Sequence, residues 1–115
     1  MTNISKASKI YIAGHNGMVG SALWRLFTAR GYFNLIGKDS NDLDLRDSNA
    51  TEIFISKEKP DVIINAAAKV GGILANDQYP YEFLMDNMLI QNNLIGLAHK
   101  YDIDKLIFFV SSCIY

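Results

Sequence analysis

The chain has 115 residues, 50% of them hydrophobic, and a formal net charge of −1, so it can bury the core of one domain but lacks the positive charge typical of nucleic-acid binding. Its single cysteine excludes an internal disulfide, and no paired cysteines indicate a metal site. The first nine residues lack the apolar core of a signal peptide and no apolar run is long enough to cross a membrane, so we expect a cytoplasmic protein with no membrane or nucleic-acid partner.

Hydrophobic periodicity predicts strands and helices that alternate along the chain. Short apolar runs, each expected as a buried strand, lie at residues 9–14, 33–37, 62–68 and 105–112. Helices are expected at residues 18–30, from Asp47 through Phe54, and at residues 82–101. Gly31 and Asp47 are the residue types that commonly end and begin a helix. Residues 70–81 contain two adjacent glycines and Pro80, which indicate a loop.

The order of these elements, β-α-β-α-β-loop-α-β, predicts an α/β protein. Because the strands are apolar throughout, we expect a parallel sheet that is covered on both faces. Right-handed crossovers then lead to a doubly wound sheet with the strand order 3-2-1-4. The chain stops directly after a buried type of strand, so we expect a domain that is truncated after its fourth strand.

Three glycines lie between the first strand and the first helix, in the pattern G-x-x-G-x-x-G. In this position Gly14 permits a tight turn, Gly17 lets the backbone approach a pyrophosphate, and Gly20 lets the helix pack closely. The free N–H groups at the start of the helix then face the phosphates. A turn that simply requires glycine is the alternative, but the flanking strand and helix favour an NAD(P)-binding Rossmann unit.

The residues after the second strand bear on the choice of cofactor, because the adenosine ribose lies at this point of a Rossmann sheet. An acidic residue favours NAD and a basic residue favours NADP, and here Lys38 and Asp39 offer both, followed by Ser40. An exposed turn is an equally good interpretation of Lys38 and Asp39. Asp44 and Leu45 are expected near the adenine, although Leu45 is equally typical of core packing.

Two further strand ends carry candidate site residues. Ala66 and Ala67 leave room for a cofactor, although close helix packing explains them equally well. After the fourth strand, alternation places Ser111 and Cys113 on one face, where a hydroxyl can bind a substrate oxygen and a thiol can exchange a proton. On chemistry alone, a lone cysteine is more often inert packing. His15 has no companion at metal-ligand spacing and is expected at the surface.

Three motifs together resemble the GDP-L-fucose synthase family of extended short-chain dehydrogenases/reductases: GHNGMVGSA at 14–22, AAAKVGGILAN at 66–76 and SSCIY at 111–115. The resemblance implies a GDP-sugar substrate, epimerised at C3 and C5 and reduced at C4 with NADP(H), NAD(H) being possible. It also implies a homodimer through helices that include residues 82–101. Ser111 matches the serine that binds the keto oxygen, and Cys113 matches the acid/base of epimerisation.

The expected cofactor contacts combine the glycine loop with the positions that the resemblance adds. They are Gly14, Asn16, Gly17, Met18, Val19, Gly20, Lys38, Ser40, Asn41, Asp44, Leu45, Ala66, Ala67, Phe109 and Ser111. Asn16 and Ser40 stand where the family often has arginines that hold the 2′-phosphate, which weakens the expectation of NADP.

The tyrosine and lysine of the family's Y-x-x-x-K motif have no expected counterpart, so residues 1–115 alone are expected to be inactive. We therefore expect the N-terminal portion of the cofactor domain, with the rest of that domain and the substrate domain beyond Tyr115. Two alternatives remain open: another NAD-dependent sugar-nucleotide epimerase or dehydratase, and a non-catalytic nucleotide-binding or dimerising module.

Overall fold

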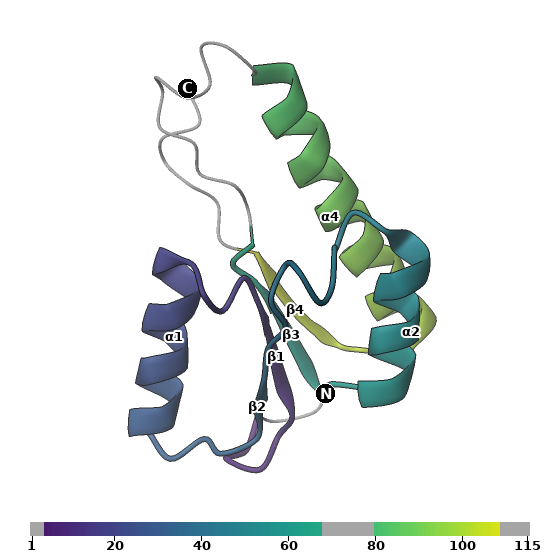
Figure 1. Ribbon diagram of the computed structural model, residues 1–115. Coiled ribbons are helices and arrows are strands. Elements are labelled where there is room, and N and C mark those ends of the chain that lie inside the picture. Colours follow the sequence, from purple (N-terminus) through teal and green to yellow (C-terminus); the bar gives the residue numbers. More distant parts are fainter. Residues whose placement is uncertain (1–3, 68–79, 109–115) are drawn as a thin grey trace.

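A computed structural model of the chain describes residues 4–67 and 80–108 (Figure 1). Within them, parallel strands form one sheet in the order β2-β1-β3-β4. These strands are β1 (Ile10–Ala13), β2 (Leu35–Ile36), β3 (Val62–Asn65) and β4 (Lys105–Phe108). The expected α/β parallel sheet is confirmed, and β1, β2 and β3 are shorter than their apolar runs.

The expected strand order 3-2-1-4 is wrong. The third strand lies beside the first strand, on the side opposite the second, with Ile10 paired to Val62 and Ala13 paired to Asn65. The chain passes from β1 to β2 over one face and returns from β2 to β3 over the other, because right-handed crossovers in opposite directions use opposite faces. The direction of winding therefore changes at β1, which creates a switch point between β1 and β3.

The helices lie on both faces of this sheet, with α1 (Met18–Ala29) on one side and α2 (Ser48–Glu58) and α4 (Pro80–Lys100) on the other (Figure 1). Gly31 has a positive φ of 90° just after α1, as expected for a terminating glycine. The Asp47 carboxylate accepts the backbone N–H groups of Asn49 at 3.1 Å and Ala50 at 3.2 Å, which confirms it as the N-cap of α2. The last helix begins at Pro80, earlier than expected, because proline suits a first helical turn.

Two hydrophobic layers follow from the alternation of side chains along the strands. On one face, Ile10, Ile12, Val62 and Ile64 pack against Leu23, Trp24 and Phe27 of α1. On the other face, Tyr11 and Ile63 join a larger cluster with residues of α2 and α4, which include Phe54, Ile55, Leu94 and Leu97. Leu43 and Leu45, in the segment between β2 and α2, are buried in the same cluster. These layers hold the carboxyl ends of β1 and β3 in a fixed position.

Some expected features lie outside the described residues. They are most of the predicted loop at 70–81 and the end of the fourth apolar run, with Phe109, Ser111 and Cys113. Among residues 4–67 and 80–108, no helix combines the length and apolarity needed to cross a membrane.

Candidate cofactor-binding site

A cavity of about 520 Å³ opens at the carboxyl ends of β1 and β3, at the switch point. Ligands of doubly wound sheets bind at this place. Its lining comprises Gly14, Gly17, Lys38, Ser40, Leu43, Asp44, Leu45, Arg46, Ala66, Ala67 and Ile90. A second cavity of about 410 Å³ shares Gly14, Gly17, Lys38 and Ser40 and adds His15, Asn16, Asp39 and Asn41. The structure thus brings together residues from four separate stretches of the sequence.

Most of the expected cofactor contacts lie in these two cavities. Those in the lining are Gly14, Asn16, Gly17, Lys38, Ser40, Asn41, Asp44, Leu45, Ala66 and Ala67. Three expected contacts do not line either cavity: Met18 is 89% exposed, Val19 is also exposed, and Gly20 is buried behind the turn. Phe109 and Ser111, and the expected catalytic Cys113, fall outside the described residues.

Glycine is required at different positions of the loop for different structural reasons. Gly14 has a φ of +79°, and a Cβ there would lie 2.6 Å from the Ala66 carbonyl oxygen. A Cβ on Gly20 would lie 2.0 Å from the Gly14 carbonyl oxygen, so α1 packs directly on the turn. Among residues 4–67 and 80–108, a Cβ on Gly17 would have only the Gly14 carbonyl oxygen nearby, at 3.4 Å, which is close to ordinary contact. The protein itself therefore tolerates a side chain at Gly17, and the space kept open there belongs to the cavity.

The residues present fit a dinucleotide. Gly17 is the N-cap of α1, and no side chain caps this helix, so its first N–H groups remain available to phosphate oxygens. Across the cavity, the buried Asn65 side chain accepts the backbone N–H of Ala67 at 3.0 Å and holds the small residues after β3 in place. Leu45 and Ile90 provide apolar walls of the larger cavity.

A polar cluster lies between the glycine loop and the end of β2. Asn16 donates its side-chain amide to the Asp39 carboxylate, and His15 Nε2 lies 3.9 Å from the same carboxylate oxygen. His15, expected at the surface, is half-buried, with 21% of its side chain exposed. Its ring packs 5.4 Å from the Trp24 ring and against Gly37, where a Cβ would lie 2.6 Å from the imidazole. His15 Nδ1 is buried, with no hydrogen-bond partner in the described part of the chain.

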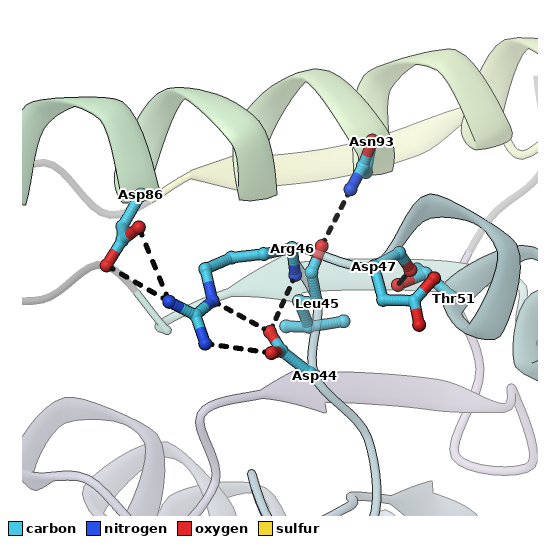
Figure 2. A network of polar contacts seen from close by, with 7 residues as sticks. All are labelled: Asp44, Leu45, Arg46, Asp47, Thr51, Asp86 and Asn93. Carbon is cyan, nitrogen blue, oxygen red and sulfur yellow. Dashed lines mark hydrogen bonds and ion pairs between the residues drawn. The ribbon is translucent and has the colours of Figure 1, made fainter. Parts of the chain in front are cut away.

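Arg46 is a cavity residue that the sequence analysis missed (Figure 2). Its guanidinium donates to both oxygens of Asp44, at 3.0 and 2.8 Å, and faces Asp86 of α4 at 3.5 Å. Hydrogen bonding to Asp44, aided by the charges of Asp44 and Asp86, raises the pKa of Arg46 further above its usual range. About two helical turns beyond Asp86, Asn93 donates to the Leu45 carbonyl at 2.8 Å. These contacts hold the segment with Asp44, Leu45 and Arg46 against α4. The contacting residues are 40 or more positions apart in the sequence, so no local sequence pattern predicts the contacts.

The spacing Y-x-x-x-K does occur in the chain, at Tyr101 and Lys105, which the sequence analysis overlooked. The structure places this pair at the amino end of β4, opposite the cavity edge of the sheet. The Tyr101 hydroxyl donates to Glu52 of α2 at 2.9 Å, and that hydrogen bond raises the pKa of Tyr101. A tyrosine that donates protons in hydride transfer requires the opposite shift and a place beside the cofactor, so this pair does not serve that purpose.

Comparison with characterised proteins agrees with this geometry. The chain is 48% identical over 107 residues to a GDP-L-fucose synthase of Escherichia coli K12, covering 93% of the chain and 33% of that relative. It is 48% identical over 110 residues to GDP-L-fucose synthase 1 of Arabidopsis thaliana, covering 96% of the chain and 34% of that relative. The chain thus spans about a third of the length of these relatives.

Solved structures show the same fold. The structure of MlghC, a GDP-mannoheptose C4 reductase from Campylobacter jejuni with NADP bound, superposes with a TM-score of 0.88 at 37% identity, over 93% of this chain and 34% of that one. The structure of DdhaC superposes with a TM-score of 0.93 at 44% identity, over 98% of this chain and 33% of that one. In sequence, residues 10–115 match the family described as NAD dependent epimerase/dehydratase. The chain belongs to the NAD dependent epimerase/dehydratase family.

Proposed function

We propose that residues 1–115 form the N-terminal, cofactor-binding part of a GDP-L-fucose synthase-like enzyme. This enzyme epimerises GDP-4-keto-6-deoxy-D-mannose at C3 and C5 and reduces C4 with NADPH. The observation that carries the proposal is the cavity at the switch point, where Gly17 keeps open a space that the protein itself does not need. The GDP-L-fucose synthases among the relatives supply the substrate class.

The residues of this chain have distinct tasks in the proposal. The backbone at Gly17 and the first turn of α1 bind the pyrophosphate. Lys38 and Ser40 lie toward the adenosine ribose, and Leu45 and Ile90 pack against the adenine. By resemblance, Ser111 hydrogen-bonds the substrate keto oxygen and Cys113 exchanges protons during epimerisation. The cofactor supplies the hydride when it is bound.

NADP(H) is the proposed cofactor. The MlghC structure, at 37% identity, has NADP bound, and a Campylobacter jejuni GDP-D-glycero-L-gluco-heptose synthase, also 37% identical, was solved in the presence of NADPH. Lys38 lines both cavities, and it is the cation proposed to meet a 2′-phosphate.

A homodimer and a cytoplasmic location complete the proposal. The α4 residues Met85, Met88, Leu89 and Ile95 are exposed by 37–47% and recur at helical spacing on one face. A second copy of the enzyme is the proposed occupant of that face, in line with the family resemblance. The cytoplasm is proposed because a proton-exchanging Cys113 requires a compartment that keeps thiols reduced.

A second candidate is a related GDP-sugar epimerase or reductase that acts on a heptose. The two Campylobacter jejuni structures named above favour it, because both proteins are 37% identical to this chain and both are named for GDP-linked heptoses. A non-catalytic nucleotide-binding module is the remaining alternative.

The test is turnover by the full protein that carries this chain. We expect NADPH oxidation with GDP-4-keto-6-deoxymannose and solvent deuterium incorporation at C3 and C5. Cys113→Ser should abolish the deuterium exchange, while a polypeptide limited to residues 1–115 should show no oxidation. Turnover with GDP-linked heptoses alone would favour the second candidate. Dinucleotide binding without turnover of either class would favour the module.

A further inference from the structure

Asn16 is the one asparagine of the sequence that precedes a glycine, and both residues are exposed in the turn before α1. Asparagine is a thermolabile residue, because the backbone nitrogen of the next residue can attack its side-chain carbonyl carbon. Glycine has no Cβ to hinder this approach. Gly17 moreover faces the open space of the cavity rather than a packed side chain of the described residues. The pair therefore combines the reactive sequence with an accessible position.

We propose that Asn16 is a site of spontaneous deamidation in this protein. The Gly17 nitrogen loses its proton and forms a bond to Asn16 Cγ, the bond from Cγ to Nδ2 breaks, and Nδ2 leaves as ammonia. Water then opens the cyclic imide at either of its carbonyl groups, which produces aspartate or isoaspartate in place of Asn16. The net change is the hydrolysis of one amide, and water is the only co-reactant.

Two hydrogen bonds restrain this reaction while the turn is closed. The Asn16 amide donates to the Asp39 carboxylate, and the Gly17 N–H donates to the Gly14 carbonyl oxygen at 3.0 Å. The first bond holds the side chain toward the segment after β2, and the second keeps the attacking nitrogen engaged. Both bonds must open before the nitrogen reaches Cγ, so the opening of the turn controls the rate of modification.

A bound dinucleotide protects Asn16, and this part of the inference rests on the proposed function. The pyrophosphate is proposed to bind at Gly17 and the first turn of α1, where no side chain caps the helix. A ligand that binds the closed turn lowers the population of the open one. The modification is therefore a property of the protein without cofactor.

The products damage the same site. Aspartate in place of Asn16 puts a second carboxylate beside Asp39 and beside the place proposed for the phosphates, where like charges repel. Isoaspartate adds a carbon to the backbone of a turn that is already tight, since a Cβ on Gly20 would lie 2.0 Å from the Gly14 carbonyl oxygen. Ageing of the free protein thus removes its ability to bind dinucleotide.

The test is peptide mapping by mass spectrometry of the full protein, aged at mildly alkaline pH without dinucleotide. Asn41 is the matched control, because it is exposed and lines the same cavity as Asn16 but precedes an aspartate. Asn16 should deamidate several-fold faster than Asn41. Asp39→Ala should speed the reaction at Asn16 by about two- to tenfold, the effect expected for the loss of one hydrogen bond. A rate at Asn16 no greater than that at Asn41, or no faster in Asp39→Ala, would overturn the inference.

Ageing in the presence of NADPH separates this inference from the proposed function. Bound NADPH should slow the reaction at Asn16 several-fold. Without NADPH, wild type should lose dinucleotide binding as Asn16 is modified, whereas Asn16→Gln should keep its starting affinity, because the longer side chain cyclises far more slowly. Bound NADPH that leaves the rate unchanged, or binding that survives the modification, would contradict the inference. Failure of fresh protein to bind either dinucleotide would overturn the proposed function instead, and the rates at Asn16 and Asn41 would still decide the modification.

Discussion

Three glycines form the turn after β1, and among them Gly17 has space for a side chain. We expect Gly17→Ala to lower the thermal midpoint of unfolding only slightly, because alanine is a poorer N-cap than glycine, and to weaken dinucleotide binding by about 1.5–3 kcal/mol, the value of a charge-assisted hydrogen bond. The reason is that the new methyl group enters the cavity rather than the protein. Calorimetric binding together with thermal unfolding measures both effects.

Gly20→Ala is the contrasting control for this prediction. Its Cβ would lie 2.0 Å from the Gly14 carbonyl oxygen, so the backbone must shift and the protein should lose stability. Unchanged cofactor affinity in Gly17→Ala, with an intact fold, would contradict a pyrophosphate site at this turn.

Glu52 gives the protein a predictable response to acid. Hydrogen bonds from Lys100 and then from Tyr101 lower the pKa of Glu52 below its ordinary value. A carboxylate with a lowered folded-state pKa contributes stability above its unfolded pKa, and this contribution is lost as the pH falls through the folded value. Glu52→Gln should therefore be less stable than wild type at neutral pH and converge with it as the pH falls through the lowered folded-state pKa of Glu52. Chemical denaturation at a series of pH values would show this, and a constant difference between the two proteins would refute it.

At the scale of elements, the stability of α2 depends on the hydrogen bonds that Asp47 accepts at its N-terminus. Asp47 accepts two backbone N–H groups at the start of the helix, and its own carbonyl accepts the Thr51 hydroxyl at 2.7 Å (Figure 2). Asp47→Ala should lower the free energy of unfolding by about 1 kcal/mol, since it leaves helical N–H groups without an acceptor. Asp47→Ser should lose much less stability than Asp47→Ala, because the serine hydroxyl accepts the same hydrogen bonds. Urea denaturation of the three proteins decides the matter, and equal losses in both variants would contradict a capping role.

Local patterns in the sequence predicted the elements well but not their arrangement. The apolar run before Gly14 and the helical spacing after it produced β1 and α1 as expected, since both signals reside within a few residues. The third strand can pair on either side of β1, depending on the path that the chain takes over the sheet. Local sequence patterns do not determine this path. The links between Arg46 and Asp86, and between His15 and Asp39, join residues that are far apart in the chain. Such pairs become visible only when the fold brings them together.

For the whole molecule, the exposed apolar face of α4 predicts how copies associate. Gly96 lies on the same face, and a Cβ added there would have no atom of the described residues within 4 Å. Another helix can therefore approach closely at Gly96. Met88→Lys, combined with Leu89→Lys, should convert the proposed homodimer of the full protein to monomers, because buried charges without partners oppose association. Sedimentation velocity would measure the change, with Ile53→Lys, an exposed position on α2, as the control. A wild-type monomer, or a dimer that survives both substitutions, would exclude this face.

Trp24 is the only tryptophan among these 115 residues, and its ring packs against His15 on the wall of the smaller cavity. The indole thus lies one side chain away from the place proposed for the adenosine ribose. Its fluorescence comes from a single location, and a ligand that shifts His15 or Asp39 changes the polarity and the quenching groups around it. The molecule therefore contains its own optical probe beside the proposed cofactor site.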